Sequence, residues 1–353
     1  MRIRGVELTY PRAVFVAVLL VTVTAVGVAV GTSSAAYGSY NYDWDGTSET
    51  RTVAADAGSD VEIVRSPAGY RQADAANATA LILEPTEAYS ESEADAVASF
   101  LDRGGTVIVA AETDGPSNRL LTDLGVASRF DGRPLRDDQR HYGNPAFPVA
   151  TPVRESPATS DVSQVTLNHG TSVTASASGT ALVTSSAFSY RDANANGGLD
   201  PAEPIRTYPV VVRENAGNGS VILVSDGSVF INGMLDRTDN RQFTANLLGG
   251  SDALLVDHQR RQAIPPVVAF ALTTADSPLR QLLLGVALLA AVGVAWRRRG
   301  SGVAADDSDT TATEHPSRAA LEAALSERRP DWDDERVERV AREATTDEPG
   351  SNG

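Results

Sequence analysis

The sequence predicts an α/β fold with a mainly parallel sheet flanked by helices, a β-rich insertion in that domain, and a transmembrane helix on either side of it. Short apolar runs alternate with amphipathic helical patterns from residue 61 to residue 112, which is the rhythm of α/β proteins. The runs are continuously apolar, as in strands that are buried on both faces of a parallel sheet. Two longer apolar runs near the chain ends indicate the transmembrane helices.

The strands and one helix of this domain can be located from the residues. Apolar runs predict strands at 61–64, 80–84 and 106–112. Ser90 and Glu93 are spaced as a capping box and predict a helix over 90–105, which the Gly104–Gly105 pair ends. Further along, the sequences TALVTSSAFSY and RTYPVVVRE are rich in Val, Thr and Tyr and predict the strands of the β-rich insertion.

The two apolar runs set the predicted topology. Arginines flank residues 13–31 on the N-terminal side and residues 279–296 on the C-terminal side, so the positive-inside rule places both termini in the cytoplasm. The predicted localisation is therefore the cell membrane, as a two-pass protein with the membrane as a partner. The expected order is a cytoplasmic N-terminus (1–12), a transmembrane helix (13–31), an extracytoplasmic domain (40–255), a transmembrane helix (279–296) and an acidic cytoplasmic tail (297–353). A cleavable signal peptide is the alternative for the first run, and a buried helix for the second.

Composition excludes several classes of function. The 353 residues include no cysteine, which excludes disulfides, thiolate metal sites and a cysteine nucleophile. The net charge is −16 and all 30 basic residues are arginine. Such a balance is typical of a halophile protein kept soluble by its carboxylates, and it argues against a nucleic-acid partner.

The stretch DANANGGLDPAE fits the pattern of a calcium-binding loop. Its side-chain oxygens and one carbonyl occupy the loop's ligand positions. The predicted metal ligands are Asp192, Asn194, Asn196, Gly198, Asp200 and Glu203. Because strands flank the loop on both sides and only three carboxylates contribute, we expect weak Ca²⁺ binding. The alternative is a polar hairpin tip, which has no need of Glu203.

A second polar cluster lies just past a predicted buried strand within GSVILV. Its members are Ser225, Asp226, Asn232, Asp239 and Asn240. One interpretation is a ligand pocket, since ligands bind beyond the carboxyl ends of strands in open α/β sheets. The other, which we favour, is turn and helix-capping chemistry. Ser117 is expected to cap the helix that follows it, not to act as a nucleophile, so no catalytic residue is predicted.

The acidic tail contains two candidate helices. Residues 317–328 and 332–344 have helical patterns and are separated by Pro330. The apolar stripe of the second is narrow, so we expect the helices to pair with each other or to dock on a partner.

The segment ALILEPTEAYSESEADAVASFLDRGGTVIVA (80–110), together with residues 220–248, resembles the DUF4350 family. The resemblance implies a degenerate class I glutamine amidotransferase-like fold, and MoxR-type ATPases and DUF58 proteins as partners. Glutaminase activity needs a cysteine nucleophile, which this chain lacks. The predicted function is therefore that of a membrane-anchored, non-catalytic protein that binds an extracytoplasmic ligand or partner. An envelope hydrolase is the alternative.

Overall fold

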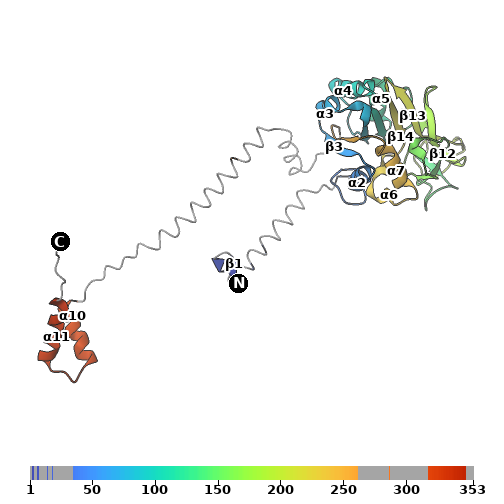
Figure 1. Cartoon of the computed structure of the whole chain (residues 1–353). Helices are drawn as coiled ribbons and strands as arrows, with labels where there is room; N and C mark the ends of the chain where they lie inside the picture. Colours follow the sequence, from blue (N-terminus) through green and yellow to red (C-terminus); the bar gives the residue numbers. More distant parts are fainter. Residues whose placement is uncertain are drawn as a thin grey trace. The chain divides into compact units, whose positions relative to one another are not determined.

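The computed structural model describes residues 35–260 and 317–346, together with residues 2–3, 6–7, 14, 18 and 286. The chain divides into two compact units, Met1–Thr273 and Thr274–Gly353. In the first unit, residues 35–260 form the α/β domain, and the short strands β1 (Arg2–Ile3) and β2 (Val6–Glu7) pair with each other. In the second, residues 317–346 form a helical hairpin (Figure 1).

A nine-stranded sheet forms the centre of the α/β domain, in the order β3-β15-β4-β5-β14-β13-β11-β8-β9. The strands are β3 (Asp60–Val64), β15 (Ala253–Asp257), β4 (Ala78–Leu83), β5 (Thr106–Ala110), β14 (Gly219–Val224), β13 (Pro209–Ala216), β11 (Thr180–Thr184), β8 (Val149–Pro152) and β9 (Val165–Thr166). From β3 to β14 all neighbours are parallel, and from β14 to β9 all are antiparallel. The sheet is therefore mixed, with the predicted parallel half joined to the β-rich half by the hairpin β13–β14.

Two further strand pairs lie outside this sheet. Strand β6 (Arg129–Phe130) pairs with β10 (Val173–Thr174), and β7 (Leu135–Asp137) pairs with β12 (Ser189–Arg191). Short 3₁₀ turns, η1 (Ala75–Asn77), η2 (Pro157–Thr159) and η3 (Gly227–Phe230), connect elements of the domain.

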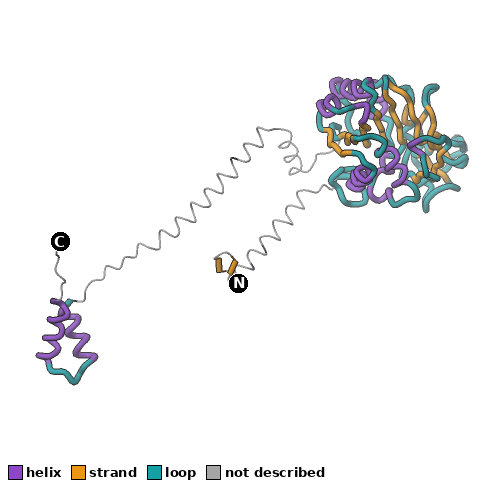
Figure 2. The backbone as a smooth tube through the Cα atoms, viewed as in Figure 1, coloured by secondary structure: helices purple, strands orange, loops and turns teal. Residues whose placement is uncertain are grey.

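Helices cover both faces of the parallel half, as Figures 1 and 2 show. They are α2 (Ser48–Asp56), α3 (Pro67–Gln72), α4 (Glu91–Asp102), α5 (Gly115–Asp123), α6 (Asn232–Leu235) and α7 (Asn240–Leu248). Alternate residues of β5 face opposite layers: Val107 belongs to the core under α3, α4 and α5, and Ile108 to the core under α2 and α7. Burial on both faces explains why the strands are continuously apolar.

Helix α4 begins as the sequence predicts. The Ser90 amide donates to Glu93 Oε2 over 2.7 Å, and Ser90 and Glu93 form a capping box. Its buried face includes Val97 and Phe100, which is fully buried, and the rings of Phe100 and Tyr70 form a T-shaped pair with their centroids 5.6 Å apart. Spacing, cap and burial therefore agree for this helix.

The helical hairpin of the second unit is made of α10 (Arg318–Arg328) and α11 (Asp334–Thr346). Val337 and Ala341 of α11 are buried, and Arg318 of α10 forms an ion pair with Glu338 of α11. The two predicted tail helices thus pair with each other.

The prediction of two transmembrane helices was wrong as part of the fold class. Among the residues that the structure describes, no helix is long and apolar enough to cross a bilayer. Both predicted spans, 13–31 and 279–296, lie outside the described residues except for Val14, Val18 and Val286. The predicted two-pass membrane localisation depended on these two spans, so that prediction was wrong as well.

Candidate functional site

The candidate site lies beyond the carboxyl ends of two neighbouring parallel strands. Strand β5 ends at Ala110 and is followed by Glu112, and β14 ends at Val224 and is followed by Ser225 and Asp226. In open α/β sheets ligands bind outside this edge, because the loops that leave parallel strands diverge there. Glu112 was included in the predicted strand 106–112, so its place at the carboxyl end could have been found from the sequence.

Glu112 is the centre of a hydrogen-bond network. Its Oε1 accepts from the hydroxyl of Tyr37 over 2.8 Å and from Ser228 Oγ over 2.6 Å. Its backbone amide donates to Glu84 Oε1 over 2.5 Å. Glu84, which follows β4, has a φ of 38°, a left-handed conformation that is uncommon outside glycine. Side chains that follow β4, β5 and β14 therefore meet at this edge.

Asp226 adds a third carboxyl group to the network. It is fully buried, and its Oδ1 accepts from the Ser228 amide over 2.7 Å, while Oδ2 accepts from the Asn168 amide. Burial, and then the charge of Glu112, raise the pKa of Asp226 well above its usual value. The same two causes raise the pKa of Tyr37. Both causes favour the neutral, protonated forms of Asp226 and Tyr37.

A cavity of about 580 Å³ opens over this network. We call it the carboxyl-edge cavity. Its lining includes the large side chains of Tyr37, Trp44, Phe147, His169 and Met234 and the polar side chains of Asp45, Glu112, Asn168, Ser228 and Arg237. Trp44 is 68% exposed, although it lines the cavity, which is unusual for so large an apolar side chain. An apolar lining with a few convergent polar groups is the usual composition of a ligand site.

One wall of the cavity is held in a strained conformation. His169 has a φ of 59°, and its ring meets the Phe147 ring edge-on at 5.5 Å. The preceding residue, Asn168, donates its amide to Asp226. A non-glycine residue in the left-handed region costs free energy, and such residues cluster at functional sites.

The polar cluster predicted after β14 is mainly structural. Asn232 donates its side-chain amide to Asp43 O over 2.7 Å, and Asn240 Oδ1 accepts from the Thr166 amide over 2.9 Å. Asp226 caps η3 through Ser228, as turn chemistry predicts. Asp239 is the N-cap of α7 but has no side-chain capping bond, since its carboxylate accepts from the Ser163 amide instead.

The expected role of Ser117 was wrong. Helix α5 begins at Gly115 with Asp114 as its N-cap, so Ser117 lies inside the helix. It is fully buried and its Oγ has no hydrogen-bond partner among the described residues. Without a base in reach, it is not placed as a nucleophile.

A different serine meets a histidine, which the sequence did not reveal. Ser39 Oγ lies 2.8 Å from Nε2 of His258. Ser39 is 1% exposed, however, and neither residue lines the carboxyl-edge cavity. A nucleophile must be within reach of a substrate, so this contact does not build an acyl-transfer site.

The predicted calcium loop is closed by its own hydrogen bonds. Asp192 Oδ2 accepts from the Gly197 amide over 2.9 Å, as in a tight ligand loop. Glu203 accepts from the amides of Ala193 (2.7 Å) and Asp200 (3.0 Å), so the loop needs this carboxylate even without a metal. Its presence therefore does not separate a metal site from a polar turn.

Two features of the loop oppose a bound cation. Arg136 Nε forms an ion pair with Asp192 Oδ2 at 2.8 Å. The amide nitrogens of Asn194 and Asn196 donate to Asp200 Oδ2, so these two groups must turn over before their oxygens can face a metal. Leu199, the apolar residue of the loop, is 41% exposed, so it does not anchor the loop in the core. The Gly198 amide donates to Asn196 Oδ1 over 2.9 Å, which holds that amide oxygen within the loop.

Within the described ranges, no group of three or more His, Cys, Asp or Glu side chains is arranged to hold a metal ion. Asn194 and Asn196 are not of those types, so the predicted loop depends on amide oxygens for two of its five side-chain ligands.

Fold and cavity together define an α/β protein with an open mixed sheet and a ligand-sized cavity at the carboxyl edge of its parallel strands. The chain belongs to the DUF4350 family, described as a domain of unknown function, whose sequence profile matches residues 39–248. This confirms the resemblance seen in the sequence. None of the curated proteins compared with the chain matches it.

Several solved structures are similar to the chain at low identity. The mmIFT52 N-terminal domain is 14% identical, with 50% of this chain and 75% of that chain covered and a TM-score of 0.38. Cytoplasmic protein STM1381 from Salmonella typhimurium LT2 is 13% identical, with 59% and 88% covered and a TM-score of 0.40. A β-galactosidase from the Antarctic haloarchaeon Halorubrum lacusprofundi is 16% identical, with 60% and 27% covered and a TM-score of 0.34. Likeness at this level says nothing about ligand or activity.

Proposed function

We propose that the α/β domain binds a small ligand in the carboxyl-edge cavity and does not transform it. The observation that carries this proposal is the cavity itself, in which aromatic side chains surround the carboxylate of Glu112. The hydroxyls of Tyr37 and Ser228 both donate to Oε1 of that carboxylate, so Oε2 is placed to accept a hydrogen bond from a ligand. The degenerate, non-catalytic character that the family resemblance implies agrees with the absence of cysteine.

The chemistry of the cavity favours a ligand with a flat apolar body and a cationic group. Tyr37, Trp44 and Phe147 offer aromatic surface to such a body. Two carboxylate side chains, Glu112 and Asp45, line the cavity. Arg237 is engaged over the Tyr142 ring at 4.5 Å. An ammonium group is attracted both by the carboxylates and by the aromatic faces.

Calorimetric titration of the full chain with tyramine tests this proposal, with 4-ethylphenol as the matched probe that lacks the ammonium group. We expect tyramine to bind at least tenfold more tightly. Glu112→Gln keeps the size of the side chain and should remove that difference, since a hydrogen bond to a charged group contributes about 1.5 to 3 kcal/mol. Glu155→Gln, at an exposed residue outside the cavity, is the control. Equal affinities for the two probes would contradict the ligand class.

A second proposal concerns the loop at 192–203, which we propose binds Ca²⁺ weakly. The supporting observation is that two carboxylates, Asp192 and Glu203, are buried within one short loop, at 0% and 8% exposure. Among the described residues, Arg136 is the one cationic side chain that forms an ion pair with Asp192. A divalent cation would neutralise these charges at the cost of turning the two asparagine amides.

Thermal unfolding of the full chain in Ca²⁺, in Mg²⁺ and in chelator tests this. Ca²⁺ at ten times its Kd should stabilise the domain by about 1.4 kcal/mol, and Mg²⁺ should do less because it demands a smaller octahedral shell. Glu203→Gln should lower the midpoint in chelator, since Glu203 accepts two backbone bonds, and should also abolish the gain from Ca²⁺. A wild-type midpoint unchanged up to about 10 mM Ca²⁺ would refute the metal site.

The partners implied by the family resemblance remain part of the proposal. We propose that the hairpin of α10 and α11 contacts a MoxR-type ATPase or a DUF58 protein. Its exposed charged side chains, such as Arg342 and Glu338, support a docking role. Capture of either purified protein by the full chain, and its loss on deletion of residues 317–353, is the test; capture that survives the deletion would exclude the hairpin.

A further inference from the structure

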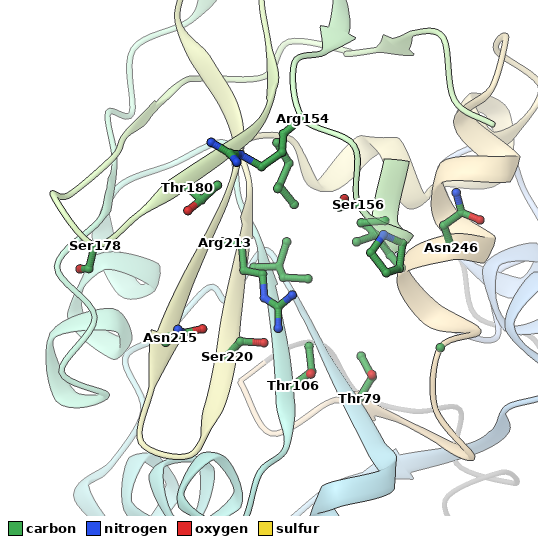
Figure 3. A pocket seen from close by; sticks show the side chains of 16 residues that line it. Thr79, Thr106, Arg154, Ser156, Ser178, Thr180, Arg213, Asn215, Ser220 and Asn246 are labelled. Carbon is green, nitrogen blue, oxygen red and sulfur yellow. The ribbon is translucent and has the colours of Figure 1, made fainter. Parts of the chain in front are cut away.

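A second hollow, separate from the carboxyl-edge cavity, lies toward the opposite ends of the parallel strands. It has a volume of about 680 Å³ and is lined mainly by hydroxyl, amide and guanidinium groups (Figure 3). The hollow lies on the same face of the sheet as the core under α2 and α7, and it shares Ile222 and Leu247 with that core.

The floor carries a row of polar side chains in register. Thr79 of β4 lies opposite Thr106 of β5, Thr106 lies opposite Ser220 of β14, and Ser220 lies opposite Asn215 of β13. Neighbouring strands are about 4.8 Å apart, so the row presents four hydrogen-bonding groups at regular intervals. We call these four residues the polar row.

The polar row stands where apolar residues would be expected. Two positions further along β4, β5 and β14 lie Leu81, Ile108 and Ile222, which all belong to the core under α7. Thr79 and Ser220 are only 4% and 3% exposed. Thr106 between them is half-buried. Hydroxyls in three adjacent strands offer less to folding than the aliphatic residues that the same face carries elsewhere, so their regular placement is consistent with a binding site.

Two arginines reach the hollow above the row. Arg213 lies on β13 two residues before Asn215, on the same face of the strand, and Arg154 follows β8. Figure 3 shows Arg213 extending toward the row, and Arg154 further from the row, on the side of Thr180. Neither guanidinium has a carboxylate partner within 4.0 Å in the described part of the chain, although the protein carries 46 acidic residues.

From this arrangement we infer that the hollow binds a small polyhydroxylated anion, namely a sugar that carries a phosphate or a similar oxyanion. The two guanidinium groups bind the oxyanion, since their planar donors match its geometry and remain charged at any physiological pH. The polar row binds the sugar hydroxyls, which both donate and accept hydrogen bonds. An acidic chain would repel an anion elsewhere on its surface, so the arginine pair restricts binding to this hollow.

Calorimetric titration of the full chain with glucose 6-phosphate, inorganic phosphate and glucose, at about 0.1 M salt to limit screening, tests the inference. Glucose 6-phosphate should bind at least tenfold more tightly than phosphate, and glucose should show no saturable binding. Arg213→Gln and Arg154→Gln should each weaken glucose 6-phosphate and phosphate about tenfold or more, because each removes charge-assisted bonds. The matched control is Arg119→Gln, at an exposed arginine of α5 outside the hollow.

Thr106→Val separates the two parts of the site, because it removes one hydroxyl of the row and keeps the shape. It should weaken glucose 6-phosphate severalfold and leave phosphate unchanged. The inference is overturned if neither anion binds, if Arg119→Gln weakens binding as much as Arg213→Gln does, or if Thr106→Val weakens both anions equally. Binding of random-sequence DNA that depends equally on Arg213 and Arg154 would also overturn it, in favour of a polyanion surface.

Discussion

The hydroxyl of Tyr37 donates a hydrogen bond to Glu112 Oε1 over 2.8 Å, although the two residues are 75 positions apart. This bond joins the segment that precedes α2 to the carboxyl end of β5. The same segment is held by Asn232, whose backbone amide donates to Gly46 O over 2.7 Å. The N-terminal segment of the domain is therefore a wall of the carboxyl-edge cavity.

Removing the Tyr37 hydroxyl should measurably destabilise the domain. Tyr37→Phe keeps the ring but takes one donor from Glu112, and we expect a loss of about 0.5 to 1.5 kcal/mol in the free energy of unfolding. Urea unfolding of the full chain measures it. Tyr42→Phe, at a ring that is 69% exposed, should be neutral. Equal stability of the two variants would show that the bond does not hold the segment.

The hairpin β13–β14 requires glycine at position 219. A Cβ at Gly219 would lie 2.1 Å from the backbone oxygen of Gly105, which cannot move aside as a flexible side chain can. Gly219→Ala should therefore cost about 1 to 3 kcal/mol. At Gly115, which begins α5, a Cβ meets nothing within 4 Å, so Gly115→Ala should be neutral or slightly stabilising. Thermal unfolding of both variants distinguishes a steric cause from a general cost of losing glycine.

Glu214 should contribute stability that acid removes. It is 3% exposed, and its carboxylate accepts from the amides of Ala127 and Ser128, each over 2.9 Å. Burial alone raises the pKa of Glu214, but the hydrogen bonds outweigh it and lower the pKa from 4.5 to about 2. Because the folded pKa lies below the unfolded one, this stability is present above pH 4.5 and is lost as the pH falls toward 2.

Glu214→Gln should therefore destabilise the domain by about 1 to 3 kcal/mol at neutral pH, and the difference from wild type should shrink between pH 4.5 and pH 2. Subtracting the variant's unfolding curve from the wild-type curve at each pH isolates this carboxyl group from the others that titrate in the same range. A difference that stays constant across the range would exclude the assigned pKa.

Arg136 should compete with calcium in the loop at 192–203. Its guanidinium forms an ion pair with Asp192, so Arg136→Gln removes a positive charge from the proposed site. We expect Ca²⁺ affinity to rise by roughly tenfold, while the chain in chelator becomes less stable because Asp192 loses its partner. Arg140→Gln, at an exposed neighbour, should change neither quantity. If both variants bind Ca²⁺ more tightly, the cause is the change in net charge and not the ion pair between Arg136 and Asp192.

The local elements of the parallel half could be predicted from sequence because each has a strong local cause. The strand over 106–110 is apolar at every position after Thr106, and the helix at 91–102 has both its cap and its periodicity. The carboxyl-edge cavity could not be predicted, since it joins Tyr37, Glu112 and Ser228 across three separate segments. The role of Glu203 was misjudged because a pattern of ligand types does not show which backbone amides those oxygens accept from.

Fluorescence of Trp44 tests the central claim, that the carboxyl-edge cavity binds a ligand, most directly. The chain has three tryptophans, so Trp296→Phe and Trp332→Phe leave Trp44, which lines the cavity, as the only tryptophan reporter. The emission of Trp44 should change on titration with tyramine and reach saturation. Glu112→Gln should weaken binding and so raise the half-saturation concentration about tenfold. An emission that does not saturate, or a titration that Glu112→Gln leaves unchanged, would contradict binding at this site.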